Sequence, residues 1–363
     1  MACWTNLPRE FGRTCAECPC RRLSIGTHRR GGLRPPVKRW RVLSEAELIQ
    51  RYFMSAPRRA DVVLGIGDDG AIIHAEAGHD IVVSVDTLIE GVHFPPDTPP
   101  AAVGHKSLAV NLSDLAAMGA EPAWATLSLT LPCVDENWLA AFSAGLFGLA
   151  DRYQVELIGG DLTQGPLSIT IQVMGSLPRG ESLRRDGARA GDLIFVTGTI
   201  GDAGLGLEAV CKMRALNAAS MEWCLSRLNK PSPRVDAGVK LRTVASAAID
   251  VSDGLARDLD RILSASVVGA SLDLRSIPVS AAARDAYAGQ VAWPAVLTAG
   301  DDYELLFTVP PARASELTIL FADADCDITR IGVVEPAAGL RFTLGGAAWK
   351  LLVPAGYDHF AGR

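Results

Sequence analysis

The stretch GIGDDGAIIHAEAGHDIVVSVD, residues 65–86, decides which fold the first half of the chain adopts. Its glycines match GxGxxG, the turn of dinucleotide-binding folds, and Asp86 follows at about the distance of the ribose-binding acid of those folds. That motif requires a helix directly after the glycines, whereas AIIHAEAGHDIVV is rich in β-formers and too short for a helical crossover. The stretch therefore predicts short strands around a glycine turn, and it argues against a dinucleotide-binding fold of this kind.

Helices and strands are mixed in both halves of the chain. Helical periodicity covers residues 101–118 and 138–153, and strand-like segments include WATLSLTLP and SITIQVMG. A polar, glycine-rich break at residues 178–192 precedes a second series, which begins with LIFVTG and includes a helix over residues 250–264. We therefore expect an α/β or α+β protein of two domains with mixed sheets covered by helices. The expected domains are residues 44–178 and 193–363, with a linker over residues 179–192.

The composition is that of an ordinary globular protein, with 48% hydrophobic and 21% charged residues in a chain of 363. A formal net charge of -6 argues against a general nucleic-acid binder, which needs a positive surface. No apolar run reaches the roughly 18 residues that span a bilayer, and the N-terminus lacks the apolar core of a secretory signal. Eight cysteines are too few for a disulfide scaffold. We expect a cytoplasmic protein without nucleic-acid or membrane partners.

Residues 1–43 differ from the rest of the chain in charge. Residues 1–42 contain ten Lys and Arg against two Glu, and Arg, Gly and Pro are frequent. We expect residues 1–43 to form a disordered basic extension, and a start codon assigned too early would produce the same feature. Ser44 and Glu47 then form a capping-box pattern, which predicts that the folded region begins with a helix.

Three cysteines of this extension, Cys15, Cys18 and Cys20, are close together in sequence. Thiolates at such spacing can hold zinc, with Cys3 or His28 as a fourth ligand. The usual second ligand pair at a set distance is missing, so a zinc site is the weaker of the two interpretations.

Six aspartates stand out because they lie at predicted strand ends or within apolar segments. They are Asp69, Asp86, Asp114, Asp161, Asp250 and Asp253. A lone carboxylate in such surroundings is costly unless it is paired or bound to a metal. Only Lys106 and Arg257 are close in sequence to any of them, and oxygen ligands without Cys or His indicate Mg²⁺ shared with substrate phosphates. Each aspartate alone could be a turn or N-cap residue, an interpretation that six such positions together disfavour.

A series of longer motifs carries a resemblance to a known family. The series is GIGDDGAII, SVDTLIEGVHF, HKSLAVNLSDLAAMGAEPAWATLSLTLP, LIGGDLTQGPLSI, DVSDGLARDL, GDDYELLFTV and GYDHF. From Ser44 to the C-terminus the chain closely resembles the thiamine-monophosphate kinase family. That family belongs to a superfamily with aminoimidazole ribonucleotide synthetase, selenophosphate synthetase and HypE. The resemblance implies the two-domain architecture of aminoimidazole ribonucleotide synthetase, a homodimer through the first domain, and ATP-dependent phosphorylation of thiamine monophosphate to thiamine diphosphate with several Mg²⁺ ions.

The resemblance also implies the residues of the site. The implied metal ligands are Asp69, Ser84, Val85 through its backbone, Asp86, Asp114, Asp161, Asp250 and Asp253. The implied ATP contacts are Gly160, Asp161, Arg185 and Ser252, and the implied thiamine-phosphate contacts are His93, Asp301 and Tyr357. The attacking phosphate oxygen is already ionised at neutral pH, so we expect no general base. Outside this resemblance, His93 could equally be structural and Tyr357 could equally be a packing residue.

Two positions depart from the family pattern. Asp301 stands where the family commonly has Glu, which shortens the side chain by one methylene, and Gly70 stands where Cys or Thr is frequent. The alternative functions are another ATP-dependent synthetase of the superfamily or a non-catalytic nucleotide-binding homologue. Selenophosphate synthetase is disfavoured because no Cys lies at the start of the first folded domain, and the costly aspartates argue against a non-catalytic protein.

Overall fold

The computed structural model describes residues 43–55, 58–352 and 356 of the chain. Outside them lie the predicted basic extension with Cys15, Cys18 and Cys20, and the predicted substrate residue Tyr357. The first helix is capped as predicted, because the Ser44 hydroxyl accepts the N–H of Glu47 and the Glu47 carboxylate accepts the N–H of Ser44. In the described part of the chain, no helix is both long enough and apolar enough to cross a membrane.

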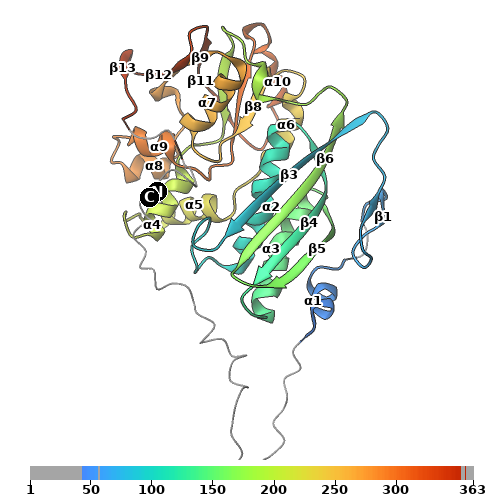
Figure 1. Ribbon diagram of the computed structural model, residues 1–363. Helices are drawn as coiled ribbons and strands as arrows, with labels where there is room; N and C mark the ends of the chain where they lie inside the picture. Colours follow the sequence, from blue (N-terminus) through green and yellow to red (C-terminus); the bar gives the residue numbers. More distant parts are fainter. Residues whose placement is uncertain (1–42, 56–57, 353–355, 357–363) are drawn as a thin grey trace, which may run out of the picture.

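The N-terminal half is a four-stranded sheet with two long helices, α2 and α3, on one face (Figure 1). The strand order is β3-β6-β4-β5, in which β4 and β5 are parallel and the other pairs antiparallel. The GIGDD turn connects the short antiparallel strands β1 and β2, as the sequence predicts. The elements are α1 (Glu45–Tyr52), β1 (Val62–Leu64), β2 (Ile72–Ile73), β3 (His79–Ile89), α2 (Pro100–Ala117), β4 (Glu121–Leu131), α3 (Glu136–Arg152), β5 (Glu156–Gln164) and β6 (Ser168–Pro178).

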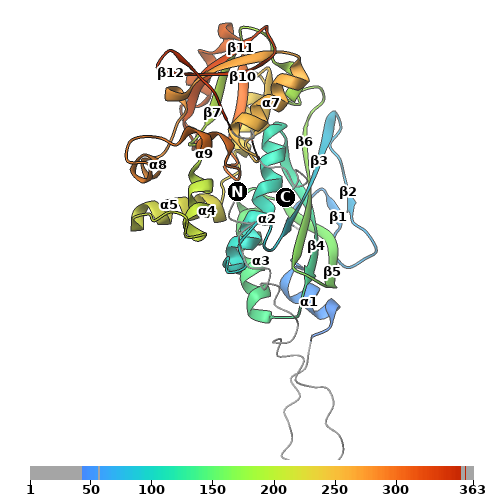
Figure 2. The same cartoon turned by 60° about the vertical axis from the view of Figure 1, so that its left-hand side comes forward.

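The C-terminal half is a seven-stranded sheet in the order β13-β12-β9-β11-β7-β10-β8 (Figure 2). Only β12 and β9 are parallel among these strand pairs. Both sheets are thus mixed, which confirms the predicted fold class. The elements are β7 (Leu193–Thr197), α4 (Asp202–Val210), α5 (Ala218–Asn229), α6 (Val235–Leu241), β8 (Ala247–Asp250), α7 (Leu255–Ser266), β9 (Gly269–Asp273), α8 (Ala281–Ala286), α9 (Trp293–Thr298), β10 (Leu305–Val309), α10 (Glu316–Leu320), β11 (Ile328–Glu335), β12 (Gly339–Leu344) and β13 (Ala347–Trp349).

Helix α2 is the central element of the structure. Most of its residues are buried, since it packs on α3, β3 and β6 of its own half and on α6 and β8 of the other half. A helix that is apolar on nearly every side belongs inside a core. Leu112 of α2 and Leu241 of α6 accordingly belong to one continuous cluster of buried side chains. The polar residues of α2 are therefore held between the two halves.

The helix predicted over residues 250–264 is wrong at its start. Asp250 is the last residue of β8, and α7 begins only after Gly254, whose φ of 112° breaks the regular backbone. The carboxylate of Asp258 accepts two consecutive backbone N–H groups of the intervening loop, at 3.0 and 2.9 Å. This tertiary contact separates β8 from α7. The apolar pattern of the sequence shows no such boundary, which is why the sequence predicts a helix that starts too early.

The contact between α2 and α3 predicts opposite effects at two glycines of α3. A Cβ at Gly145 would lie 1.9 Å from the carbonyl oxygen of Ala101, so Gly145→Ala is expected to lower the free energy of unfolding by about 1–3 kcal/mol. A Cβ at Gly148 meets nothing within 4 Å, so Gly148→Ala is expected to raise it by about 0.5–1 kcal/mol. Urea denaturation measures both changes, and equal stability of the two variants would contradict the packing described.

Candidate active site

Four of the predicted aspartates lie where α2 meets β3 and β8. We call Asp86, Asp114, Asp250 and Asp253 the helix-side aspartates. Asp114 of α2 accepts a hydrogen bond of 2.6 Å from the Ser84 hydroxyl of β3. The neighbouring Ser113 donates a hydrogen bond of 2.8 Å to Asp250 at the end of β8. The structure thus brings together predicted site residues from both halves of the chain.

Loss of hydration raises the pKa values of three helix-side aspartates, and repulsion by neighbouring carboxylates adds to this effect at Asp86 and Asp250. Asp86 keeps access to solvent, but surrounding protein atoms and the carboxylates of Asp114 and Asp253 raise its pKa to about 7. Burial also raises the pKa of Asp114, against the opposing effects of the Ser84 hydrogen bond and a nearby arginine. Burial, followed by the charge of Asp114, raises the pKa of Asp250 well above its usual value. A cation would relieve this repulsion.

Arg185 supplies the arginine charge that acts on Asp114. It lies in a short turn, Arg185–Gly187, between β6 and β7, and its carbonyl accepts a hydrogen bond of 2.8 Å from Ser266 of α7. Arg185 therefore places a guanidinium near the helix-side aspartates. A guanidinium is well suited to bind phosphate oxygens.

The loop after β8 contains Ser252 and Asp253, and α7 fixes it in place. Arg261 of α7 forms ion pairs with Asp253 at 2.5 Å and with Asp258 at 2.6 Å. Burial raises the pKa of Asp258 to about 6. Sequence reasoning missed Arg261 and Asp258 because it considered only basic residues adjacent to the aspartates. Asp258 and Arg261 are three residues apart and therefore lie on one face of the helix that follows the loop. That helical spacing is the sequence signal that would have found them.

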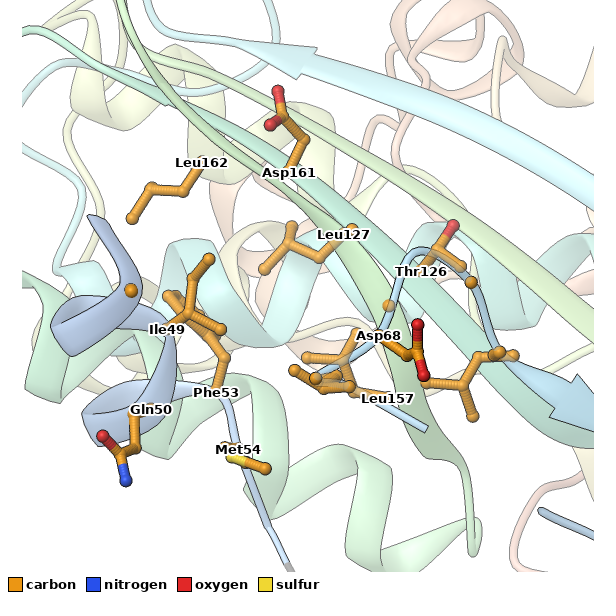
Figure 3. Close-up of a pocket in the computed structure, with 18 of the residues that line it drawn as sticks. Ile49, Gln50, Phe53, Met54, Asp68, Thr126, Leu127, Leu157, Asp161 and Leu162 are labelled. Atoms are coloured by element: carbon orange, nitrogen blue, oxygen red, sulfur yellow. The ribbon is translucent and has the colours of Figure 1, made fainter. Parts of the chain in front are cut away.

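Asp69, Gly160 and Asp161, which we call the pocket group, lie instead at a pocket beside α1 (Figure 3). The pocket has a volume of about 510 Å³ and is lined by α1, the GIGDD turn, β4 and β5. Phe53 and Leu127 contribute to its apolar wall, whereas the Asp161 carboxylate points away from them (Figure 3). Gly160 has a φ of 150°, and a Cβ there would lie 1.8 Å from the Leu127 carbonyl oxygen, so only glycine permits this approach.

The two groups are at opposite edges of the first sheet. Asp86 lies in edge strand β3 and Asp161 in edge strand β5, both inside strands and not at strand ends as the sequence suggested. Three strand spacings place about 14 Å between the two backbones. Asp86 shares the α2 face with Ser84, whereas Asp161 pairs with the exposed Ser128 on the opposite face. The side chains of one chain therefore do not bring both groups to one ion.

The two described substrate residues, His93 and Asp301, meet at Lys106 of α2. The Lys106 ammonium lies 3.1 Å from Asp301 Oδ2 and 3.4 Å from the carbonyl oxygen of His93. The Tyr303 hydroxyl donates a hydrogen bond of 3.0 Å to Asp301 Oδ1. Sequence reasoning assigned no role to Lys106 or Tyr303, although a lysine within an otherwise apolar helix is a detectable signal.

For two further predicted residues, Val85 and Tyr357, the described part of the chain shows no contact that supports the predicted role. Val85, expected to act through its backbone, directs its side chain to the face opposite α2 and is 56% exposed. Tyr357 lies outside the described residues. Its neighbour Gly356 packs against the loop after β8, because a Cβ there would lie 2.4 Å from the Asp253 carbonyl oxygen.

Comparison with known proteins links this geometry to one group of enzymes. The family models that match are AIR synthase related protein, N-terminal domain, over residues 67–177, and AIR synthase related protein, C-terminal domain, over residues 189–345. Thiamine-monophosphate kinase of Escherichia coli (strain K12) is 45% identical over 324 residues, which cover 87% of this chain and 98% of the relative. That of Bacillus subtilis (strain 168) is 33% identical over 326 residues, which cover 88% and 100%.

Solved structures show the same likeness. The crystal structure of thiamine-monophosphate kinase from Stenotrophomonas maltophilia K279a is 45% identical, with a TM-score of 0.75, and covers 80% of this chain and 93% of its own. The structure of AaThiL complexed with AMPPCP and TMP is 32% identical, with a TM-score of 0.70, and covers 81% and 92%. The two-domain architecture expected from the sequence is therefore confirmed as that of the AIR synthase related proteins.

The raised pKa of Asp86 predicts how the stability of metal-free protein depends on pH. Between its usual pKa of 3.8 and its folded pKa of about 7, Asp86 binds a proton more tightly in the folded than in the unfolded chain. The free energy of unfolding should therefore fall as pH rises through this window. Asp86→Asn removes the titrating group, so its stability relative to wild type is expected to increase as pH rises.

Denaturation by urea in EDTA at several pH values measures this difference. Asp80→Asn is the matched control, because Asp80 is an exposed aspartate of the same strand, paired with Arg179 at the surface. A pH-independent difference between Asp86→Asn and wild type would contradict the prediction.

Proposed function

The chain belongs to the thiamine-monophosphate kinase family, and from this premise we propose that the helix-side aspartates and the pocket group together bind Mg²⁺ and ATP. The reaction is ATP-dependent phosphorylation of thiamine monophosphate to thiamine diphosphate. Identity of 45% to enzymes of that name supports it over the reaction of another synthetase of the superfamily. The observation that carries the site is the convergence of Asp86, Asp114 and Asp250 from three separate elements.

The donor set of the helix-side aspartates fits Mg²⁺. Its members are carboxylates that repel one another, with the Ser84 hydroxyl beside them. Among residues 43–55, 58–352 and 356, no group of three or more Asp, Glu, His or Cys side chains is arranged to hold a metal ion. Mg²⁺ suits such a site, because proteins usually hold it by one or two carboxylates while water and substrate phosphates complete the shell. We therefore assign several Mg²⁺ ions to the site, each shared with ATP.

The residues of the chain bind and orient, and none removes a proton. The attacking phosphate oxygen of thiamine monophosphate is ionised at neutral pH, so the reaction needs no general base. Bound Mg²⁺ would neutralise the phosphates and align donor with acceptor. Arg185 adds positive charge beside Asp114, and Ser252 belongs to the loop that carries Asp253. His93 and Asp301 hold the thiamine moiety, whose thiazolium ring is a cation that the Asp301 carboxylate attracts.

We assign the adenine base of ATP to the pocket beside α1. The apolar wall around Phe53 and Leu127 suits a flat aromatic base, and a volume of about 510 Å³ accommodates it. Gly160 brings backbone close to the ligand, while Asp69 and Asp161 provide carboxylates for the metal at the phosphate end. In this proposal the GIGDD turn contributes to nucleotide binding through the Asp69 carboxylate, which binds the metal. Its glycines do not contact the pyrophosphate directly.

A second copy of the chain completes the site in this proposal. Edge strand β3 exposes apolar side chains on the face opposite α2 and α3, namely Ile81, Val83, Val85 and Ile89, at 38%, 55%, 56% and 40%. An exposed apolar patch of this kind supports an interface with another protein. Asp161 lies on the same face, so a homodimer formed there brings the pocket group of one chain towards edge strand β3 of the other.

The proposed interface belongs to the first domain, residues 44–178. We place the linker at residues 179–192 and the second domain at residues 193–363; the separate family matches to residues 67–177 and 189–345 support a division in this region. ATP and thiamine monophosphate are soluble metabolites, which supports a cytoplasmic location.

Activity of the purified protein tests the proposed function. With Mg²⁺ present it is expected to convert thiamine monophosphate and ATP into thiamine diphosphate and ADP. Chromatography measures both products. Asp114→Asn and Asp161→Asn are each expected to lower kcat by at least about 100-fold, because each removes a carboxylate from the metal. Absence of thiamine diphosphate at every Mg²⁺ concentration would contradict the function, and full activity of either variant would remove that residue from the site.

Mixing these two variants tests whether one site draws on two chains. After subunit exchange about half of the dimers contain one chain of each kind. If Asp114 and Asp161 of different chains share a site, each mixed dimer has one intact site, and activity returns to about one quarter of wild type. If both residues of one chain serve the same site, every site keeps one defect and no activity returns. Each variant exchanged with itself is the control.

A further inference from the structure

Lys106 is a buried cation that connects the two parts of the thiamine-phosphate site. Its side chain is 3% exposed, and burial of an ammonium at this depth is costly without partners. The partners are the Asp301 carboxylate at 3.1 Å and the His93 carbonyl oxygen at 3.4 Å. His93 follows β3 in the N-terminal half, whereas Asp301 precedes β10 in the C-terminal half. Lys106 therefore lies between two substrate residues that are far apart in sequence.

We propose that Lys106 is a positioning residue for thiamine monophosphate, an inference that rests on the proposed function of His93 and Asp301. It holds the Asp301 carboxylate and the His93 backbone at a fixed separation, and it thereby determines the affinity for thiamine monophosphate and not for ATP. The exposed fractions support positioning over direct contact. The Asp301 side chain is 30% exposed and can meet a ligand, whereas the Lys106 side chain at 3% is covered.

The position of the Asp301 carboxylate is set by the backbone of Asp301 and by two side-chain contacts. Asp301 has a φ of 70°, a conformation that residues other than glycine adopt only when their surroundings hold them there. Its N–H donates to the Ser252 carbonyl at 2.9 Å, which ties the residue to the loop after β8. The Tyr303 hydroxyl holds Oδ1 and Lys106 holds Oδ2, so both carboxylate oxygens have defined positions.

This arrangement also accounts for Asp where the family commonly has Glu. An aspartate has one side-chain torsion fewer than a glutamate, so the place of its carboxylate follows its backbone closely. The strained backbone of Asp301 and the Lys106 ammonium together determine where that carboxylate lies. Without Lys106 the carboxylate loses one of its two side-chain contacts.

Lys106→Met tests the proposal, because it removes the charge and keeps an unbranched side chain that is only one atom shorter. We expect KM for thiamine monophosphate to rise at least about tenfold while KM for ATP stays within about twofold. Isothermal titration with thiamine monophosphate should show the same loss of affinity. The double variant Lys106→Met/Asp301→Asn should lose less affinity than the sum of the losses in the two single variants, because Lys106 acts in part through Asp301.

Arg242→Met is the matched control. The Arg242 side chain is 9% exposed and also pairs across the two halves, with Glu121 at 2.8 Å, but it contacts neither His93 nor Asp301. We expect Arg242→Met to lower the melting temperature and to leave KM for thiamine monophosphate unchanged. If Lys106→Met does not fold, Lys106→Gln, which keeps a donor for the His93 carbonyl and loses the charge, is measured in its place.

The outcomes separate this inference from the proposed function. A wild-type protein that makes no thiamine diphosphate contradicts the proposed function. An active wild type with an unchanged KM for thiamine monophosphate in the Lys106 variant overturns the role of Lys106 alone. Equal rises of KM for both substrates, or the same rise in Arg242→Met, would also overturn it, because a purely structural residue behaves in that way.

Discussion

Burial of charged side chains on α2 is the constraint on which the rest of the site depends. The helix lies between its own sheet and the C-terminal half, so Lys106 and Asp114 lose most of their hydration there. Charges buried in this way need partners with good geometry. Lys106 forms an ion pair with Asp301 of the C-terminal half. Asp114 accepts a hydrogen bond from the Ser84 hydroxyl and also interacts with the positive charge of Arg185. The polar contacts that satisfy α2 therefore also bring residues of the candidate site together.

The strand order of the first sheet adds a second constraint. It places β3 and β5 at opposite edges, and the pleat directs Asp86 and Asp161 to opposite faces. A single chain can fold completely and still keep the two acidic groups apart. The apolar side chains exposed along β3 give a physical reason for a second copy to bind on that face. In the proposed homodimer, association and assembly of the site both follow from this sheet topology.

Local chemistry made much of the fold predictable from the sequence. The Ser44 capping box, the strands after the GIGDD turn and the helix that carries Asp114 depend on neighbouring residues, and all are present. The start of α7 was not predictable, because Asp258 reaches back to the loop before it through a tertiary contact. Residue types likewise indicated which aspartates to suspect. Their division into two groups follows from strand order, which no local pattern contains.

We propose that the helix-side aspartates of one chain and the pocket group of another serve one Mg²⁺ and ATP site. A crystal structure of the protein with Mg²⁺, thiamine monophosphate and a non-hydrolysable ATP analogue tests it most directly. We expect metal ions within about 2.1 Å of carboxylate oxygens, with Asp86 or Asp114 from one chain and Asp161 from its partner around the same phosphates. Metal ions bound entirely by one chain, or none at Asp86 and Asp114, would contradict it.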